Sequence, residues 1–474
     1  MCRLHAQDIL CTFRSAWGHL VRPIANVRVL GLFGYINHDV DFNKEPSITI
    51  ISGPNGAGKT HFLRILHGLM VLDLNTLASV EFDRIEVTFR DKWIMGIRQI
   101  RDGDRVSDFE LYGKKPLVRK RQTLKFKFNE EEQSVEDAPE HWTRLPDGSW
   151  YDTRFDRAIP VAQAKRWGLA VTPPALERVK GTWAEDLFAD SRTIFVDTQR
   201  LDAAPTGAKP QGRVVRHAKP GTTATKILLY INQVTAQLSD ARRKSLDESL
   251  SADQTFAERV MQKARTTIKE RELKERYERI ADQHAELHAS GMSVRPVDVR
   301  FPEGRPNPTE KRILNIFLDD WERKLKPLLP IHEKLNSLRR IIKTKFIGKE
   351  LFLSPRGQIR FRSKVNGRTL SVHSLSSGEQ HLLAVFTMLL FSAEKGALVL
   401  IDEPEISMHA AWKHDFLKDI EEVARISDLQ IVVATHSSAI IHGNWHLVQE
   451  FELPDVGEEG LEVAGSDDEL DEEV

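Results

Sequence analysis

The feature that most constrains this chain is a glycine-rich run at residues 53–60, Gly-Pro-Asn-Gly-Ala-Gly-Lys-Thr. It matches the phosphate-binding pattern G-x-x-x-x-G-K-[ST] in full, and it stands between an apolar run, residues 48–51, and a helical pattern. Glycines let consecutive backbone N–H groups turn toward phosphate oxygens, whose charge the helix dipole favours. We therefore predict a nucleoside triphosphate site in which Lys59 reaches the β and γ phosphates and the Thr60 hydroxyl binds Mg²⁺. The expected binding residues are Gly53, Pro54, Asn55, Gly56, Ala57, Gly58, Lys59 and Thr60.

A second motif lies far along the chain, where the apolar run 398–401 ends in Asp402 and Glu403. Four apolar residues indicate a buried strand, so the two carboxylates emerge at its carboxyl end, where α/β proteins bind nucleotides. We expect Asp402 to hold the Mg²⁺ shell and Glu403 to polarise the attacking water. Paired with the glycine-rich loop, this motif predicts ATP hydrolysis to ADP and phosphate with Mg²⁺.

Composition excludes several classes of protein. The 474 residues suffice for two or three domains at about 150 residues each. Apolar residues make up 41% and charged residues 29%, which argues against wholesale disorder and against a membrane-embedded body. No window approaches the roughly 18 apolar residues of a spanning helix, and no signal peptide is recognisable at the start. The only cysteines, Cys2 and Cys11, build no disulfide framework, so we expect a cytoplasmic protein.

The net charge of -1 hides an asymmetry, because residues 452–474 carry 11 acidic side chains and no Lys or Arg. The rest of the chain is therefore basic, with a net charge of +10. A basic cluster surrounds an expected hairpin, and it is either a solvated surface or a sequence-independent contact with a nucleic-acid backbone. Its members are Lys114, Lys115, Arg119, Lys120, Arg121, Lys125 and Lys127.

Strand-like runs dominate the two ends of the chain. The first half, residues 25–200, predicts a mixed sheet around one helix, residues 60–71, with a turn at 102–104. Its strands are expected at residues 26–30, 47–52, 81–89, 93–100, 123–128 and 193–198. The second half, residues 346–452, predicts strands at 351–353, 358–362, 397–401 and 430–434. An extension, residues 1–24, and an acidic tail, residues 453–474, flank them; the tail is expected to be disordered.

Residues 201–345 predict a helical insert after a Pro- and Gly-rich linker, residues 205–221. Apolar positions spaced as in a coiled-coil seam indicate two helices in an antiparallel hairpin, separated by a break near residues 249–251. The seam residues are Ile227, Ile231, Val234, Leu238, Ala241, Leu273, Tyr277, Ile280, His284 and Leu287. A third helical stretch, residues 308–343, is interrupted around Pro327 and Pro330. Either an ordinary helical subdomain on the sheet or a protruding arm satisfies this pattern.

Residues 375–380, Leu-Ser-Ser-Gly-Glu-Gln, open a helix expected to run to Phe391. They resemble the signature motif of ATP-binding-cassette (ABC) ATPases in the form of the OLD-like and SMC-like branches. The resemblance implies an α/β P-loop head split by a helical, coiled-coil-like insert. It also implies that Ser376, Ser377 and Gly378 bind the γ-phosphate of ATP held by a second copy of the chain. Ser376 with Glu379 equally fits a capping box, and both roles are compatible.

Further residues take roles from the same resemblance. His436, at the end of an apolar strand, is similar to the switch histidine that hydrogen-bonds the γ-phosphate. Gln199 resembles the glutamine that ligates Mg²⁺, and residues 405–409 resemble the segment that contacts the opposite subunit. Phe33 or Tyr35 is a candidate for stacking on adenine, with a place in the core as the alternative. Ser377 and Glu379 depart from the commoner signature, without removing a proposed catalytic group.

The resemblance implies a homodimer or higher homo-oligomer around two ATP molecules. Only 38 residues follow His436, too few for the nuclease domain that OLD proteins carry, so we expect a separate effector. We compare the chain with the stand-alone ATPases of anti-phage systems such as PARIS, Septu and retron-associated modules. There a conformational switch, triggered by DNA or a phage protein, would control a TOPRIM or HNH nuclease or a toxin. The alternatives are a RecF/SMC-like repair ATPase that binds duplex DNA with ATP, and a scaffold that uses ATP only for assembly.

Overall fold

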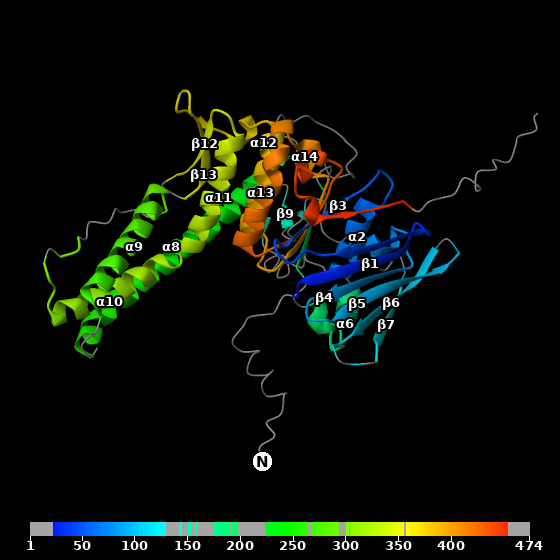
Figure 1. Cartoon of the computed structure of the whole chain (residues 1–474), viewed down its shortest axis with the longest axis horizontal. Helices are drawn as coiled ribbons and strands as arrows, with labels where there is room; N and C mark the ends of the chain where they lie inside the picture. Colours follow the sequence, from blue (N-terminus) through cyan, green and yellow to red (C-terminus); the bar gives the residue numbers. More distant parts are fainter. Residues whose placement is uncertain are drawn as a thin grey trace, which may run out of the picture.

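The computed structural model describes most of the chain and is shown in Figure 1. The described residues are 22–103, 105–116, 118, 120–128, 142–144, 150–152, 157–159, 174–188, 192–197, 223–262, 268–292, 300–302, 304–354 and 357–453. The extension 1–24, the linker 205–221 and the acidic tail therefore lie wholly or almost wholly outside them. Among the described residues, no helix is both long and apolar enough to cross a membrane.

A five-stranded, all-parallel sheet forms the centre of the head. In spatial order its strands are β11 (Thr193–Asp197), β15 (Leu398–Asp402), β16 (Gln430–Ala434), β3 (Ile48–Ser52) and β17 (Val448–Glu450). The strands β15 and β16 are buried at every position, which explains their unbroken apolar runs. Because the strands are parallel, their carboxyl ends meet along one edge, where α/β proteins bind ligands.

A separate six-stranded antiparallel sheet lies beside the first (Figure 1). Its order is β2 (Ile36–Asp41), β1 (Ile24–Leu32), β4 (Arg84–Phe89), β5 (Ile94–Asp102), β6 (Arg105–Lys114) and β7 (Gln122–Lys127). The single mixed sheet expected for the first half is therefore wrong. Strands β2 and β6 escaped prediction because polar residues interrupt their alternation, yet each pairs with a strongly patterned neighbour.

Helix α2 (Lys59–Val71) fills the space between the two sheets, where Phe62, Leu63 and Leu66 are fully buried. Residues of both sheets share this core, so burial of α2 sets the position of the glycine-rich loop that precedes it. Three short helices pack on the same core: α3 (Leu74–Ala78), α6 (Pro174–Val179) and α7 (Glu185–Phe188). A small sheet of β8 (Trp142–Arg144), β9 (Trp150–Asp152) and β10 (Arg157–Ile159) completes this half.

Helices α8 (Thr223–Gln262), α9 (Glu270–Ala289) and α10 (Pro308–Leu325) form an arm that projects away from both sheets (Figure 1). The protruding form of the insert is thus the observed one. The break near residues 249–251 is wrong, because α8 is continuous there. Serine favours a helix end mainly because its side chain can cap one. Here the helix continues because α10 packs along α8 and Arg259 on α8 bonds Asp320 on α10.

Helix α11 (Leu329–Lys345) follows the arm back to the head, and the predicted interruption around Pro327 and Pro330 is confirmed. It leads into a three-stranded sheet of β12 (Lys349–Leu353), β13 (Ile359–Ser363) and β14 (Thr369–Leu370). The remaining helices of the head are α12 (Ser377–Thr387), which continues as a π-helical turn (Met388–Ser392), α13 (Ala410–Ser427) and α14 (Ser438–Ile441). Short 3₁₀ turns lie at Val372–Ser374, Pro404–Ser407 and Trp445–Leu447. Near its start α8 packs against α12, which joins the arm to the head.

Candidate nucleotide-binding site

The glycine-rich loop joins β3 to α2, as the sequence pattern predicts. Two of its glycines are needed for close approach. A Cβ on Gly53 would lie 2.4 Å from the carbonyl oxygen of Phe451, and one on Gly58 would lie 2.5 Å from the Cδ2 of Leu32. Gly58 also has a φ of 82°, in the left-handed region that side chains disfavour. The loop therefore holds its shape against two other segments of the head.

Lys59 points back across the loop. Its Nζ donates to the carbonyl oxygens of Gly53 and Pro54, both at 2.9 Å, and lies 3.3 Å from the Nδ1 of His436. Burial lowers the pKa of Lys59 from its usual range, and the negative charges of Glu403, Asp402 and Glu405 partly offset this. An ammonium held by two neutral carbonyls near three carboxylates can exchange these bonds for phosphate oxygens at small cost.

Asp402 and Thr60 meet although 342 positions separate them. The Thr60 hydroxyl, in the first turn of α2, donates to the Asp402 Oδ1 at 3.1 Å. Asp402 ends β15, and its neighbour on β16 is Ala434, so the two carboxyl strand ends lie level with each other. This register brings both motifs predicted from the sequence to one edge of the parallel sheet.

Glu403 and His436 face each other at that edge, with the Glu403 Oε1 3.6 Å from the His436 Nε2. Glu403 has a φ of 45°, a left-handed backbone conformation that a non-glycine residue adopts at an energetic cost. Glu405 fixes the backbone at His436, because its Oε1 accepts from the Thr435 hydroxyl at 2.7 Å and from the His436 backbone N–H at 2.9 Å. The sequence analysis assigned residues 405–409 to a contact between subunits and did not predict these hydrogen bonds of Glu405.

These side chains line one pocket of about 340 Å³. Its lining is Phe33, Asn55, Gly56, Gly58, Lys59, Thr60, His61, Arg64, Asp402, Glu403 and His436. Of the two aromatic candidates, Phe33 lines the pocket and packs edge-on against His61 with ring centroids 4.9 Å apart, whereas Tyr35 is 56% exposed and lies outside the lining. His61 and Arg64 went unmarked in the sequence, although they follow Thr60 on α2 and a helical projection would have found them.

The signature residues lie elsewhere on the chain. Ser376 caps α12 in a capping box with Glu379, as expected, and Ser376 and Ser377 are exposed. The Glu379 carboxylate also accepts from the Nζ of Lys349 at 2.5 Å, which ties the helix tip to β12. In the described part of the chain, Ser376, Ser377 and Gly378 are absent from the pocket lining. Gln199, the remaining proposed Mg²⁺ ligand, falls outside the described residues.

The loop also has a support that the sequence did not reveal. His38, on β2, bonds the carbonyl oxygen of Ala57 through its Nε2 at 2.8 Å and is buried. Its ring stacks on Phe451, with centroids 3.6 Å apart and planes within 14°. Burial lowers the pKa of His38, and the hydrogen bond that its Nε2–H donates to the Ala57 carbonyl partly offsets this shift.

Comparison with known proteins gives one family match and one curated relative. Residues 236–442 match the family model described as "AAA domain, putative AbiEii toxin, Type IV TA system". A protein of Dictyostelium discoideum, itself described as uncharacterised, is 30% identical over 110 residues, which are 22% of this chain and 14% of that protein. The chain thus covers only a small part of the length of this relative.

Solved structures of SMC head domains are also similar. One is the Pyrococcus furiosus Smc head with an extended coiled coil bound to the C-terminal domain of ScpA, at 14% identity and a TM-score of 0.33, covering 88% of this chain and 91% of that one. Another is the Thermotoga maritima SMC head, at 10% identity and a TM-score of 0.29, covering 90% and 94%. The family match and the glycine-rich loop define an ATPase domain of P-loop type, built on an α/β head that a helical segment interrupts.

Proposed function

We propose that this chain is a Mg²⁺-dependent ATPase that works as a homodimer, with ATP enclosed between the glycine-rich loop of one copy and the α12 tip of the other. The observation that carries the proposal is the division of the site within one chain. Lys59, Glu403 and His436 gather at the pocket, whereas the exposed Ser376 tip lies outside its lining. A helix tip with backbone N–H groups free to meet an anion is suited to complete the site of a second copy.

The residues at the pocket fit a magnesium ion. Mg²⁺ prefers oxygen ligands and keeps several waters, and the Thr60 hydroxyl and Asp402 carboxylate supply oxygens 3.1 Å apart beside the loop. Gln199 would be the third protein ligand. When bound, the ion would neutralise charge on the phosphate oxygens.

The other side chains divide the work of hydrolysis between them. Lys59 exchanges its carbonyl bonds for the β and γ phosphates, and the loop N–H groups hold the phosphate chain. Glu403 orients and polarises the attacking water, while His436, held in place by Glu405, hydrogen-bonds the γ-phosphate. Phe33 gives the adenine ring a place to stack at the pocket wall.

The biological role that we propose is a conformational switch in a prokaryotic defence or toxin–antitoxin module. Closure on ATP and opening after hydrolysis would pass through the arm to a separate effector, either a nuclease or a toxin. The family description, which names a type IV toxin–antitoxin system, supports this class of role. Co-purification of the tagged chain from its host, followed by mass spectrometry, tests it; recovery of no nuclease or toxin with either nucleotide state contradicts it.

Two substitutions test the ATPase assignment. Lys59→Ala should abolish ATP binding, whereas Glu403→Gln should bind ATP, hydrolyse it poorly and accumulate as a dimer. Size-exclusion chromatography with light scattering measures the dimer, and release of phosphate measures turnover. Lys44→Ala, at a lysine outside the pocket lining, is the matched control and should behave as the parent. Parental turnover in Glu403→Gln would show that another group activates the water.

A second candidate function is a repair ATPase that binds duplex DNA. The observation in its favour is a row of exposed lysines on the outer strand β7 and the preceding turn, among them Lys115, Lys125 and Lys127. Lysines on a sheet edge also prevent edge-to-edge association, which needs no ligand. The two explanations separate in a DNA-binding assay, because only the repair function requires ATP-dependent affinity that falls steeply with salt.

A further inference from the structure

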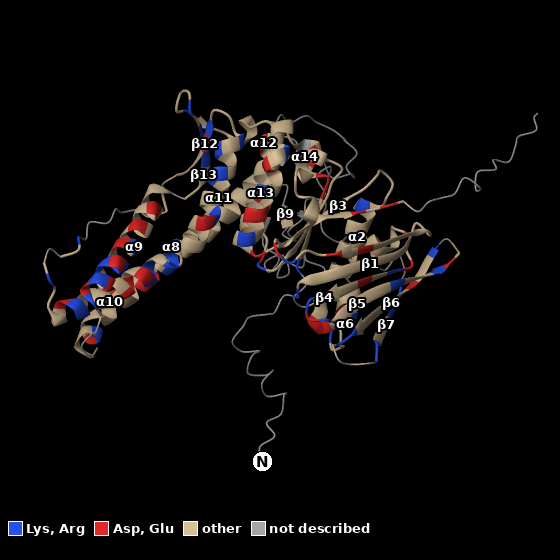
Figure 2. Cartoon of the chain, in the orientation of Figure 1, with Lys and Arg blue, Asp and Glu red and all other residues tan. Residues whose placement is uncertain are grey.

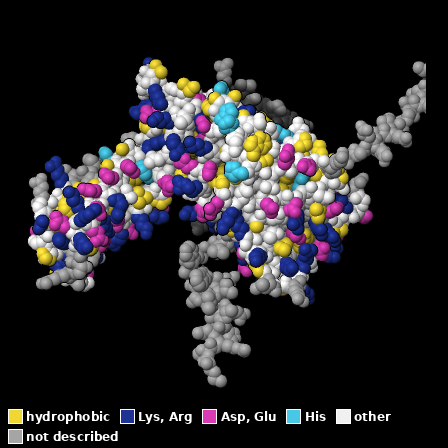
Figure 3. All heavy atoms as spheres, viewed as in Figure 1, with side chains coloured by type: hydrophobic (Ala, Val, Ile, Leu, Met, Phe, Trp, Pro, Cys, Tyr) yellow, Lys and Arg dark blue, Asp and Glu magenta, His cyan; other side chains and the backbone are white. Residues whose placement is uncertain are grey.

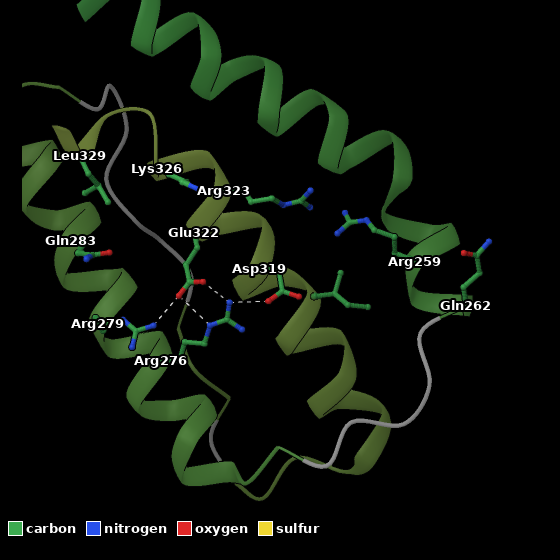
Figure 4. A pocket seen from close by; sticks show the side chains of 11 residues that line it. Arg259, Gln262, Arg276, Arg279, Gln283, Asp319, Glu322, Arg323, Lys326 and Leu329 are labelled. Atoms are coloured by element: carbon green, nitrogen blue, oxygen red, sulfur yellow. Dashed lines mark hydrogen bonds and ion pairs between the residues drawn. The ribbon is translucent and has the colours of Figure 1, made fainter. Parts of the chain in front are cut away.

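A second cavity, with a volume of about 880 Å³, lies in the arm (Figure 4). It is bounded by α8, α9 and α10, and it shares no lining residue with the ATP pocket. Its walls are Arg259, Gln262, Arg276, Arg279, Gln283, Ile316, Asp319, Glu322, Arg323, Lys326 and Leu329. A volume of this size suits a small organic ligand.

The charge on these walls is unbalanced. Four arginines and Lys326 line the pocket, and the carboxylates that oppose them are Asp319, Glu322 and the adjoining Asp320. Glu258 also adjoins the pocket, where its carboxylate accepts from the amide of Gln262. The five cations therefore face four carboxylates, and one positive charge is in excess. Basic and acidic residues alternate along the arm in Figure 2, and their side chains lie intermixed on its surface in Figure 3. An excess of cations around a cavity favours an anionic occupant.

Carboxylates on α10 hold the arginines in place. Arg276 donates to Glu322 at 2.5 Å and to Asp319 at 2.8 Å, and this raises the pKa of Arg276 further above its usual range. Arg259 bonds both carboxylate oxygens of Asp320, at 2.6 and 2.8 Å. Figure 4 shows Arg276 and Arg279 both directed at Glu322. Because these long side chains are already ordered, a ligand that meets them loses less conformational entropy on binding.

Donors remain for a ligand at the edge of this network. Among the described residues, Arg279 bonds Glu322 at 2.9 Å and Arg323 bonds Asp320, and each guanidinium has five N–H donors. Both arginines are about half exposed, with side-chain exposures of 59% and 47%. Lys326 is exposed and forms no ion pair with any residue that the structure describes. Arg279, Arg323 and Lys326 together suit phosphate oxygens.

The rest of the wall is not charged. Leu329 provides an apolar surface, and the amide of Gln283 can hydrogen-bond a heterocyclic base or a sugar hydroxyl, whereas the Gln262 Nε2 already donates to Glu258 at 2.7 Å. We propose that the arm pocket binds a phosphate-bearing ligand of nucleotide size, with its phosphates at Arg279, Arg323 and Lys326 and its ring against Leu329 beside Gln283. This site is additional to the ATP site and does not depend on the proposed hydrolysis.

Calorimetry on the full chain carrying Lys59→Ala tests the proposal, because that substitution disables the site in the head. The probes are ADP, pyrophosphate and adenosine, each at low and high salt. We expect one ADP to bind per chain with salt-sensitive affinity, pyrophosphate to bind at least about tenfold more weakly, and adenosine not to bind. Equal affinity for ADP and pyrophosphate would show that the ring of ADP makes no favourable contact with the apolar wall of the pocket.

Substitutions in the same background locate the ADP. Arg279→Ala and Lys326→Ala should each lower ADP affinity by about tenfold, and both should fold, because Glu322 keeps Arg276 and Lys326 has no described ion pair to lose. The matched control is Arg271→Ala on the same helix, since Arg271 is 90% exposed and pairs with Glu275 outside the pocket. ADP affinity unchanged by Arg279→Ala and Lys326→Ala, or lowered equally by Arg271→Ala, would refute the site, as would no ADP binding at all.

Discussion

A buried ion pair joins the base of the arm to the ATPase core, and its removal gives a quantitative prediction. The Nζ of Lys345, at the end of α11, donates to the Oδ2 of Asp419 on α13, and their side chains are only 3% and 12% exposed. Burial raises the pKa of Asp419 even though the bond from Lys345 opposes the shift. Desolvation of the carboxylate therefore outweighs its attraction to the ammonium.

The substitution Lys345→Met leaves the Asp419 carboxylate buried without its cation. We expect it to lower the free energy of unfolding by about 3–5 kcal/mol at neutral pH, the cost of breaking a buried pair. Lys345→Met combined with Asp419→Leu removes both charges and should recover most of that loss, because apolar side chains of similar volume replace a buried ion pair at little cost. Comparing the single and double variants separates two free energies: the stabilisation that the ion pair provides, and the cost of burying the Asp419 carboxylate without a cation.

Urea unfolding followed by tryptophan fluorescence measures these energies. Trp412, on α13, stacks near Phe346, with ring centroids 6.5 Å apart, and so reports on this contact. A carboxyl whose folded pKa is raised stabilises the fold most when protonated, and that contribution is lost as pH rises through the folded pKa. The deficit of Lys345→Met should consequently shrink as pH falls below neutrality toward about 4.

The control for this pair lies on the same two helices. Arg425 on α13 bonds Glu333 on α11 at 3.4 Å, and both side chains are more than half exposed. Solvent screens such a pair, so Arg425→Ala should change the free energy of unfolding by about 0.5 kcal/mol or less. A Lys345→Met protein within about 1 kcal/mol of the parent, or a double variant as unstable as the single one, would refute the reasoning.

Three further predictions concern the nucleotide site. Phe451→Ala should remove the stacking partner of His38 and weaken ATP binding by about tenfold or more in calorimetry, whereas Trp445→Ala, at a 63% exposed position, should not. Burial lowers the pKa of His38 below its unfolded value, so the stability that His38 contributes is full above about pH 6.5 and is lost as pH falls below that value. In thermal melts, this part of the fall in melting temperature at low pH should be present in the parent and absent from His38→Gln. Lys349→Ala should leave ATP binding intact but reduce ATP-driven dimerisation in light scattering, because it frees Glu379 at the signature tip.

Much of the candidate site was accessible from the sequence, for a physical reason. The loop at 53–60, the strand end at Asp402 and the helix start at Ser376 are local patterns in which a few neighbouring residues determine the backbone. Parallel pairing then places the ends of β3, β15 and β16 on one edge, so that Glu403 and His436 meet without any long-range information beyond the fold class.

The parts that escaped prediction depend on contacts between distant segments. His38 and Phe451 carry no motif, and only the pairing of β17 with β3 brings Phe451 beside the loop. The same holds for Lys345 and Asp419, which look like ordinary surface residues of amphipathic helices until α11 packs on α13. The continuous course of α8 through residues 249–251 likewise depends on α10 beside it, which local propensity does not report.

The arm is attached to the head at two helices, α12 and α13. In the proposed dimer, a nucleotide would contact the tip of α12 from one copy and the strand end before α13 from the other. The Gln237 amide of α8 donates to the carbonyl oxygen of Phe391, at the π-helical turn that ends the signature helix, and α11 is tied through Lys345 to α13, which follows the Asp402–Glu403 strand end. Close-packed interiors transmit displacement rather than absorb it. If a phosphate in a second copy draws the α12 tip inward, α8 must move with it while α13 holds α11, so the angle between arm and head changes. Under the proposed function, occupancy of the ATP pocket would thereby change the position of the arm, where the second proposed site lies.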